Sequence, residues 1–161
     1  MQIERLGEKK RDENQRLRVF LKRRTWPERR LKGIAQKFEE EMDCTTCANC
    51  CKVATVPLAA REVRRLARRL GAGEAEFLAR YTTEDEEGRR ILRRTAEGCV
   101  FLAGNLCSIY EDRPRTCENF PHLARGDGSL VSRMWQMPDR ATYCPIAYNT
   151  LEAWKREVGF R

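Results

Sequence analysis

The residues of this chain best suited to chemistry are its eight cysteines, four of which stand together in Cys44-Thr-Thr-Cys47-Ala-Asn-Cys50-Cys51. Two residues between cysteines is the spacing at which a tight turn directs both sulfurs at one ion while backbone N–H groups hydrogen-bond the thiolates. Adjacent side chains diverge from the backbone, so we expect Cys50 and Cys51 to serve different sites, or one of them to face elsewhere. The stretch predicts thiolate coordination of a metal.

A second group of cysteines follows later in the chain, and eight sulfurs are enough to close two four-thiolate sites. The spacing does not determine which thiols share a site. All eight are therefore candidate metal ligands: Cys44, Cys47, Cys50, Cys51, Cys99, Cys107, Cys117 and Cys144.

Three other residues stand close to these cysteines in the sequence. Arg113 and Arg115 precede Cys117, and a cation there would help to balance the formal charge of −2 that four thiolates give a zinc site. The alternative is that Arg113 and Pro114 begin a surface helix. His122 is the single histidine, and neutral imidazole can bind a metal or exchange protons, although a structural role is the simpler interpretation.

Ligand type alone does not identify the metal, because zinc and iron–sulfur clusters both accept four thiolates in a roughly tetrahedral arrangement. Three close cysteines with a remote Cys144-Pro145 resemble the ligand pattern of a ferredoxin-type 4Fe–4S cluster. The adjacent Cys50-Cys51 and the excess of cysteines fit no single-cluster scheme, which favours zinc. Buried thiols without a metal, or thiols that cycle through disulfides, are the remaining interpretations.

The start of the sequence bears on the compartment. A secretory signal needs roughly 7–15 apolar residues, whereas MQIERLGEKKRDEN is almost entirely charged or polar. No later stretch approaches the roughly 18 apolar residues of a membrane span. We therefore expect a cytoplasmic protein with reduced thiols, in which closely spaced cysteines indicate metal binding before disulfides.

The charge balance of 32 Lys and Arg against 24 Asp and Glu, a net +8, favours an acidic partner such as RNA, DNA or an anionic membrane face. The basic run that would serve such a partner consists of Arg61, Arg64, Arg65, Arg68 and Arg69. A solvated helix face is the simpler interpretation of that run.

Residues 1–43 lack cysteine and carry many charges of both signs, which predicts a helical N-terminal extension. Thr25-Trp26-Pro27-Glu28 has the spacing of a capping box and predicts a helix from near Pro27. Its expected buried stripe is Leu31, Ile34, Ala35, Phe38 and Met42. An earlier helix is expected through Leu17, Phe20 and Leu21.

Residues 44–161 are expected to form a cysteine-cluster metal-binding domain with a C-terminal helix. Val56-Pro57-Leu58 should open a helix that ends at Gly71, and another short helix is expected from Ala75 to Tyr81. Short apolar runs at residues 91–92 and 100–102 favour strands, with a tight turn at Ala103-Gly104-Asn105. We expect an irregular segment over 121–138 and a last helix over about 145–158. The predicted fold class is mainly α with a small β-hairpin (α+β), around an irregular cysteine-ligated metal core.

Several motifs in one order resemble the YkgJ-type cysteine-cluster family, whose members are described as zinc- or iron-chelating proteins. The motifs are Cys44-x2-Cys47-x2-Cys50-Cys51, Cys99-Val-Phe-Leu, Cys107-Ser-Ile-Tyr110, Arg113-Pro114-x2-Cys117 and Phe120-Pro121. The resemblance covers roughly Asp43 to Pro145 and implies a cysteine-ligated metal domain without a reaction common to the family. Some larger proteins with a similar cluster are described as flagellin lysine methylases, but we identify no glycine-rich nucleotide loop in this chain.

Three functional hypotheses follow. The first is a cytoplasmic metal-binding protein that chelates zinc or iron, with a mainly structural cluster and an open question of whether any reaction is catalysed. The second is an iron–sulfur redox or catalytic protein with His122 or Arg113 beside the centre. The third is a basic nucleic-acid-binding module stabilised by zinc.

Overall fold

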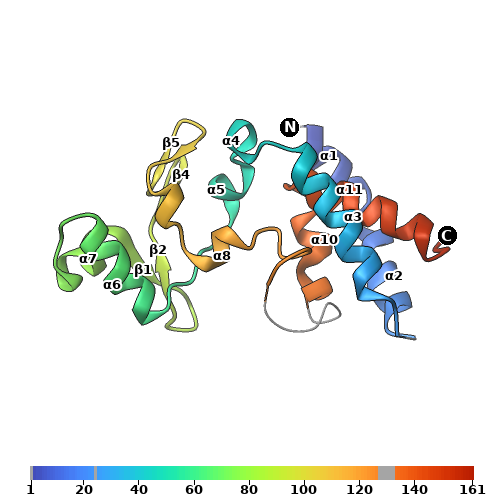
Figure 1. Ribbon diagram of the computed structural model, residues 1–161, viewed down its shortest axis with the longest axis horizontal. Coiled ribbons are helices and arrows are strands. Elements are labelled where there is room, and N and C mark those ends of the chain that lie inside the picture. The colour runs from blue at the N-terminus through green and yellow to red at the C-terminus, as the bar shows by residue number, and fades with distance from the viewer. Residues whose placement is uncertain (1, 24, 127–132) are drawn as a thin grey trace. The chain divides into compact units, whose positions relative to one another are not determined.

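A computed structural model describes residues 2–23, 25–126 and 133–161 (Figure 1). The chain divides into two compact units, one formed by residues 1–43 with 119–161 and the other by residues 44–118. We call them the terminal unit and the cysteine unit. The described structure is mainly helical with short antiparallel strand pairs, so the predicted α+β class is confirmed. No helix among the described residues is long and apolar enough to cross a membrane.

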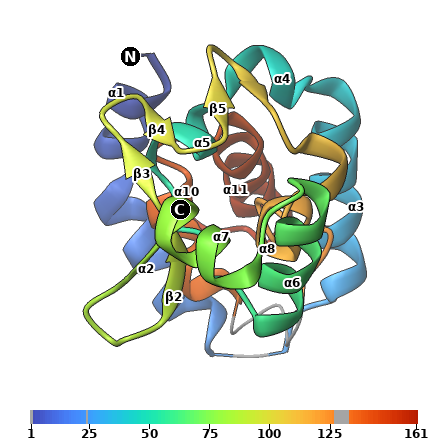
Figure 2. The ribbon, with the colours of Figure 1, turned by 90° about the vertical axis from the view of Figure 1, so that its left-hand side faces the viewer.

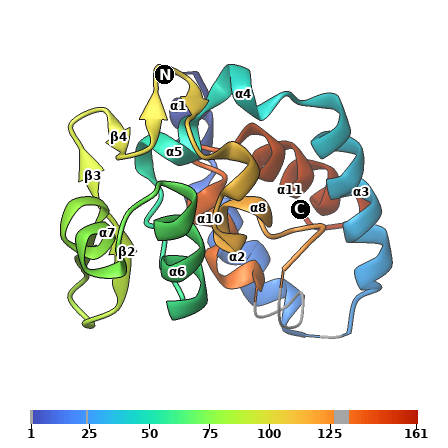
Figure 3. The ribbon, with the colours of Figure 1, turned by 60° about the vertical axis from the view of Figure 1, so that its left-hand side comes forward.

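The terminal unit is built from helices around an apolar core, and α3 lies beside α11 in it (Figure 3). The most deeply buried large side chains include Leu17, Leu31, Leu151 and Trp154. The stripe predicted for residues 31–42 is confirmed, since its members are buried in this core or packed against it. The helices are α1 (Gln2–Lys9), α2 (Arg11–Leu21), α3 (Glu28–Glu41), α10 (Met137–Arg140) and α11 (Pro145–Glu157), with a short 3-10 helix η2 (Met134–Gln136).

The start of α3 corrects one detail of the sequence analysis. The helix begins at Glu28, next to Pro27 as predicted, but Pro27 itself occupies the N-cap position with φ −71° and ψ 94°. Proline offers no side-chain oxygen to the first turn, so the capping box predicted from Thr25 and Glu28 is wrong. Thr25 lies too early in the chain to be the N-cap.

The cysteine unit combines short helices with three antiparallel strand pairs among its described residues, and α6 lies beside α7 (Figure 2). Its core contains Val63, Leu66, Phe77 and Phe101. The helices are α4 (Cys44–Cys47), α5 (Asn49–Val53), α6 (Ala60–Arg69), α7 (Glu74–Tyr81), α8 (Arg115–Glu118) and the 3-10 helix η1 (Tyr110–Asp112). The pairs are β1 (Thr82–Glu84) with β2 (Arg90–Leu92), β3 (Arg94–Thr95) with β4 (Gly98–Cys99), and β5 (Leu102–Ala103) with β6 (Leu106–Cys107).

The predicted hairpin at residues 103–105 is confirmed, because β5 and β6 pair across Gly104 and Asn105, with Gly104 at φ +62°. Glycine accepts that left-handed conformation without the clash of a Cβ. The predicted start of α6 at Pro57 is wrong. Residues 56–58 are instead extended along β2, with backbone hydrogen bonds of 2.9 Å from Leu92 N to Val56 O and from Leu58 N to Arg90 O.

The predicted C-terminal helix is confirmed, since α11 spans Pro145–Glu157 and buries Ile146, Leu151 and Trp154 as expected. Part of the irregular segment expected over 121–138 falls on residues 127–132, which lie outside the described residues. Residues 119–161 pack with residues 1–43, whereas composition alone groups them with the cysteines. The predicted domains, residues 1–43 and residues 44–161, stay a prediction.

Candidate metal centre

The first four cysteines lie on two very short helices with a sharp change of direction between them. Cys44 and Cys47 are the ends of α4, and Cys50 and Cys51 lie in α5. Ala48 separates the helices in a left-handed conformation, with φ 51° and ψ 14°, and its side chain is buried. A non-glycine residue in this region costs about 1–2 kcal/mol, so the surrounding contacts must hold the turn in place.

Cys50 and Cys51 face one another, since their Sγ atoms lie 4.0 Å apart. The expectation that these side chains diverge is wrong. The reason is that consecutive residues of a helix are separated by only about 100° around its axis, so two side chains can turn toward a common point. A tetrahedral zinc site with Zn–S bonds of about 2.3 Å has sulfurs about 3.8 Å apart, which is close to the separation observed.

The later cysteines of the unit come from three further elements. Cys99 lies on β4, Cys107 on β6 and Cys117 on α8, and all three are half-buried against the unit's core. The backbone N–H groups of Phe101 and Ile109 lower the pKa of Cys99 and Cys107, against the larger effect of burial. In each case the donor lies two residues after the cysteine, an arrangement that stabilises a thiolate.

Cys51 is electrostatically coupled to all three of these thiols. Burial is the main cause that raises the pKa of Cys99, Cys107 and Cys117, and the charge of Cys51 raises each of them further. The pKa of Cys117 rises to about 12. By contrast, the hydrogen bond with Cys50 lowers the pKa of Cys51 to about 7, with help from Lys52. Several thiolates in so small a volume require a compensating positive charge.

Cationic side chains stand near these thiols. Arg94 lowers the pKa of Cys99, and Arg113 lowers the pKa of Cys107 and Cys117, in each case against the larger effect of burial. Arg113 also stacks on Tyr110, with its guanidinium carbon 4.0 Å from the ring centroid, and donates to the Tyr110 carbonyl at 2.7 Å. It therefore lies where the sequence analysis expected a cation, and it precedes α8 rather than opening it.

Two sets of hydrogen bonds attach the cysteine-bearing helices to the strand pairs. At the tip of the β5–β6 hairpin, the Asn105 side chain donates to the Thr46 carbonyl at 3.3 Å and accepts from Lys52 Nζ at 2.9 Å. At the other end of α5, Arg94 donates to the carbonyls of Lys52 and Ala54. These bonds fix the position of α5, and with it Cys51, relative to β4 and β6.

Gly98 allows the closest approach between α5 and β4. A Cβ at this position would lie 2.7 Å from the Cys51 carbonyl oxygen and 2.9 Å from Lys52 Cα, and its φ is +138°. Only glycine fits at position 98, because a Cβ would clash with the backbone of α5 and because a residue with a Cβ disfavours this φ angle. Gly98 is what permits Cys51 on one segment to lie beside Cys99 on the other.

The cysteine sulfurs suit a thiolate-bound metal, but in this structure they lie apart from one another. Among residues 2–23, 25–126 and 133–161, no three His, Cys, Asp or Glu side chains converge closely enough to hold an ion. Soft thiolates with N–H donors and nearby cations are nevertheless the ligand chemistry that zinc and iron–sulfur clusters require. The pair Cys50–Cys51 already has the separation that such a site needs.

Residues 43–145, more than half of the chain, match the model of the CxxCxxCC family, described as a "putative zinc- or iron-chelating domain". The chain belongs to the CxxCxxCC family. The resemblance predicted over Asp43–Pro145 is thereby confirmed, as is the coarser prediction of a zinc- or iron-chelating domain. No curated protein and no solved structure matches the chain.

The CxxCxxCC match extends into the terminal unit, where two of the predicted site residues lie. Cys144 is buried in that unit's core and is the N-cap of α11, with Sγ accepting from Ala147 N at 3.5 Å. His122 has a φ of 65° and packs edge-on against Phe120, with the ring centroids 6.1 Å apart. All other cysteines lie in the cysteine unit. A metal-binding role for Cys144 or His122 stays a prediction.

Several residues that position the CxxCxxCC cysteines escaped the sequence analysis. Asn105 is placed in a turn by the sequence analysis, and no role is given there to Gly98, Lys52, Arg94 or Ala48. A glycine directly before Cys99 is a usable signal, because close approach of another backbone is a common reason for glycine in a strand. The contacts of Arg94 and Lys52 join segments about 40 or more residues apart, and no local pattern reveals them.

The basic run on α6 is divided among different roles. Arg65 and Arg69 pair with Asp112, at 3.5 and 2.8 Å, so they attach α6 to η1. Neither the family match nor the described part of the structure supports a nucleic-acid partner, which stays a prediction.

Proposed function

We propose that this protein binds a metal ion through the thiolates of Cys51, Cys99, Cys107 and Cys117, and that the ion is zinc. The observation that carries the proposal is that the cysteine-bearing segments are held against one another: Gly98 lets α5 approach β4, and Asn105 bonds the β5–β6 hairpin to α4 and α5. The charge of Cys51 also raises the pKa of Cys99, Cys107 and Cys117, which come from β4, β6 and α8. A shared metal ion requires four thiols from four elements to lie near one another, whereas core packing does not.

We prefer zinc to an iron–sulfur cluster because the adjacent Cys50 and Cys51 and the excess of cysteines fit no single-cluster ligand pattern. Four thiolates around Zn²⁺ carry a formal charge of −2, and Arg94 and Arg113 lower the pKa of the surrounding thiols. The close Cys50–Cys51 pair supplies one sulfur beyond four. Iron in a thiolate site is the alternative that the family description also allows, and the experiment below distinguishes the two.

The role of this centre is structural, since each of its elements is too short to be stable alone. A zinc site of this kind contributes its binding free energy directly to folding. Thiolate ligands must stay reduced, so the proposal includes a reducing compartment, the cytoplasm. Cys50, whose Sγ lies 4.0 Å from that of Cys51, borders this site, and Cys44 and Cys47 lie outside the set of four.

The experiment compares metal content across single Cys→Ser variants of the full, untagged chain purified without oxygen. Cys51→Ser and Cys117→Ser should each lose a full metal equivalent by elemental analysis. Cys144→Ser is the matched control: it removes a buried thiol that caps a helix in the terminal unit, and it should keep the metal content of the unaltered protein. Full metal content in both Cys51→Ser and Cys117→Ser would end the proposal.

Colour separates the two metals in the same preparations. A colourless protein that contains zinc supports the structural centre. A brown protein with iron and acid-labile sulfide would show that the centre is an iron–sulfur cluster and not zinc. Redox chemistry would then be the reaction to look for.

A further inference from the structure

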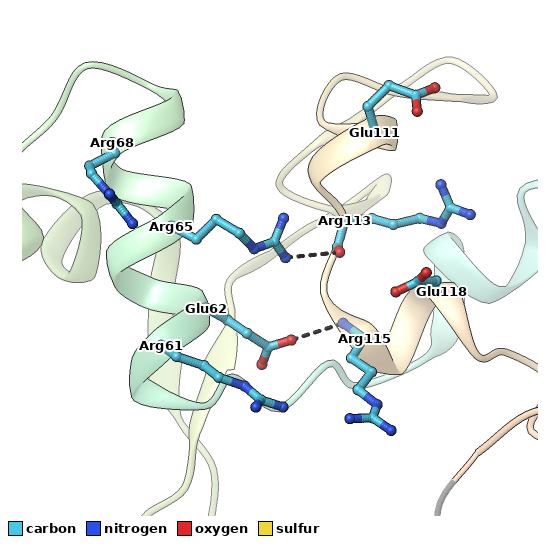
Figure 4. A pocket seen from close by; sticks show the side chains of 8 residues that line it. All are labelled: Arg61, Glu62, Arg65, Arg68, Glu111, Arg113, Arg115 and Glu118. Atoms are coloured by element: carbon cyan, nitrogen blue, oxygen red, sulfur yellow. Dashed lines mark hydrogen bonds between the residues drawn. The ribbon is translucent and has the colours of Figure 1, made fainter.

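A cavity of about 550 Å³ lies within the cysteine unit, between α6 on one side and η1 and α8 on the other (Figure 4). This volume falls in the range of about 300–1,000 Å³ that is usual for small-molecule sites. Its lining is almost entirely charged and consists of Arg61, Glu62, Arg65, Arg68, Glu111, Arg113, Arg115 and Glu118.

Three arginines of the lining share one face of α6, because Arg61, Arg65 and Arg68 are spaced at helical intervals of four and three residues. Arg65 is held in place by its own hydrogen bonds, at 2.8 Å to the Asp112 carbonyl and at 3.1 Å to the Arg113 carbonyl. It joins α6 to the segment that carries Arg113. The position of the cavity is therefore fixed by backbone contacts and not by loose side chains.

The carboxylate deepest in this lining does not neutralise the arginines. Glu62 is 8% exposed, and its two oxygens each accept a backbone N–H at 2.8 Å, one from Ala59 and the other from Arg115 (Figure 4). These two backbone N–H groups, at the start of α6 and of α8, stabilise its negative charge. Glu62 thus builds the wall of the cavity.

The remaining charges are unbalanced. Within the part of the chain that the structure describes, the side chains of Arg61, Arg68, Glu111 and Glu118 make no hydrogen bond or ion pair. Arg61 and Arg115 extend into the same space from α6 and α8 (Figure 4). Counting Asp112, which pairs with both Arg65 and Arg69, six arginines stand against four carboxylates, so the lining and its ion-pair partners keep an excess of two positive charges.

We propose that this cavity binds a small molecule through a phosphate group. A phosphate monoester carries a charge of about −1.5 to −2 near pH 7, which matches the excess positive charge of the lining. Arginine presents a planar fork of N–H donors that binds phosphate oxygens in pairs. Arg61, Arg68 and Arg115 supply the donors, while Arg65 and Glu62 hold the walls that carry them.

The ligand is a small molecule and not a nucleic-acid chain. Glu111 and Glu118 are exposed members of the same lining, and they would repel an extended polyanion that crosses the cavity. A compact anion can meet the arginines without approaching both carboxylates. The inference does not depend on the proposed metal centre, although Arg115 and Glu118 stand on either side of Cys117 in the sequence.

The test is isothermal titration calorimetry of the full chain at low salt with pyrophosphate as the probe, beside inorganic phosphate and a single-stranded oligonucleotide. The double variant Arg61→Gln, Arg68→Gln should weaken pyrophosphate binding by at least about tenfold for each charge-assisted hydrogen bond that it removes. The matched control is Arg64→Gln with Arg80→Gln, which removes the same charge from α6 and α7 outside the cavity and should bind as the unaltered protein does.

Three results would overturn the inference. Absence of pyrophosphate binding by the unaltered protein would do so, as would equal weakening in both double variants, which would indicate a general charge effect. Oligonucleotide binding that is tighter than pyrophosphate binding and equally reduced in both variants would assign the arginines to a nucleic-acid surface instead. Metal content, measured on the same samples, keeps failure of this proposal separate from failure of the metal centre.

Discussion

The two units of this protein have interiors of different kinds. The terminal unit has long helices over an apolar core, in which Trp26 contacts both Phe20 and Trp154 at ring-centroid distances of 5.3 and 6.3 Å. The cysteine unit also has an apolar core under α6 and α7, but its cysteines lie on helices of four or five residues and on strands of two. Helices shorter than about 12–15 residues are marginal in water by themselves. The terminal unit is stabilised by apolar burial throughout, whereas the short cysteine-bearing segments of the other unit depend on ligands that bind them together.

Metal removal should produce the largest difference between the units. Loss of a structural zinc removes most of the free energy that folds a small metal domain, so a chelator under reducing conditions should unfold residues 44–118. All three tryptophans of the sequence fall in the terminal unit. We therefore expect a drop in far-UV circular dichroism with unchanged tryptophan emission.

The control for this experiment is addition of zinc after the chelator is removed, which should restore the circular dichroism. An equal loss of both signals would contradict the separation between the units. So would a far-UV spectrum that does not change when the metal is gone.

Trp154→Ala should give the opposite pattern. The side chain is 1% exposed in the core of the terminal unit, and deletion of a buried tryptophan costs about 3–5 kcal/mol. Chemical denaturation followed by the emission of the remaining tryptophans should show this loss. Metal content should not change, and a variant that loses its metal would show that the units are not independent.

Gly98→Ala should destabilise the cysteine unit alone. The added Cβ would lie 2.7 Å from the Cys51 carbonyl oxygen, so α5 and β4 must separate or the backbone must shift, at a cost of about 1–3 kcal/mol. Chelator challenge should remove the metal from this variant faster than from the unaltered protein.

Gly33→Ala is the matched control for that substitution. Gly33 lies in α3 and its Cβ would meet nothing within 4 Å, so alanine should stabilise the helix by about 0.5–1 kcal/mol. Equal rates of metal loss in the two variants would show that the approach of α5 to β4 does not matter for the centre.

Glu13→Gln should have the smallest effect, and a pH-dependent one. Burial raises the pKa of Glu13, but hydrogen bonds from Lys10 and Lys155 lower it by more, so its pKa falls below the ordinary value of 4.5. A carboxylate with a lowered pKa stabilises the folded state above its ordinary pKa, and that stability is lost as the pH falls through the folded value. Lys155 is 4% exposed and bonds Glu13 at 2.8 Å.

Near neutral pH the substitution should cost the terminal unit about 1 kcal/mol, and the difference from the unaltered protein should shrink below about pH 4. Tryptophan emission during denaturation at several pH values measures this without interference from metal release. Glu8→Gln removes an exposed carboxylate that pairs with Arg11 and should change little. A pH-independent difference for Glu13→Gln would contradict the assigned cause.

The contrast between the units also explains what the sequence could predict. In the terminal unit, the apolar stripes of α3 and α11 recur at helical spacing over several turns, and the structure has both helices close to their predicted bounds. In the cysteine unit, the prediction that Val56-Pro57-Leu58 opens a helix is wrong, because hydrogen bonds to residues more than 30 positions away hold residues 56–58 along β2. Local patterns carry no information about such partners.

The chemistry of the candidate site could be predicted from the sequence, but the arrangement of its residues could not. Residue type and spacing predicted the ligand chemistry, and the family match supports it. The central position of Cys51 could not be predicted, because it depends on the left-handed Ala48, on the space at Gly98 and on the bonds of Arg94. These are tertiary contacts between segments that have no common sequence signal.

The most direct test of the account is X-ray absorption at the metal edge of the anaerobically purified full chain, with elemental analysis of the same sample. Zinc should appear in a shell of four sulfurs at about 2.3 Å, and its content should be reduced or absent in Cys51→Ser and retained in Cys144→Ser. A chain without metal, or a metal surrounded only by nitrogen and oxygen ligands, would contradict it.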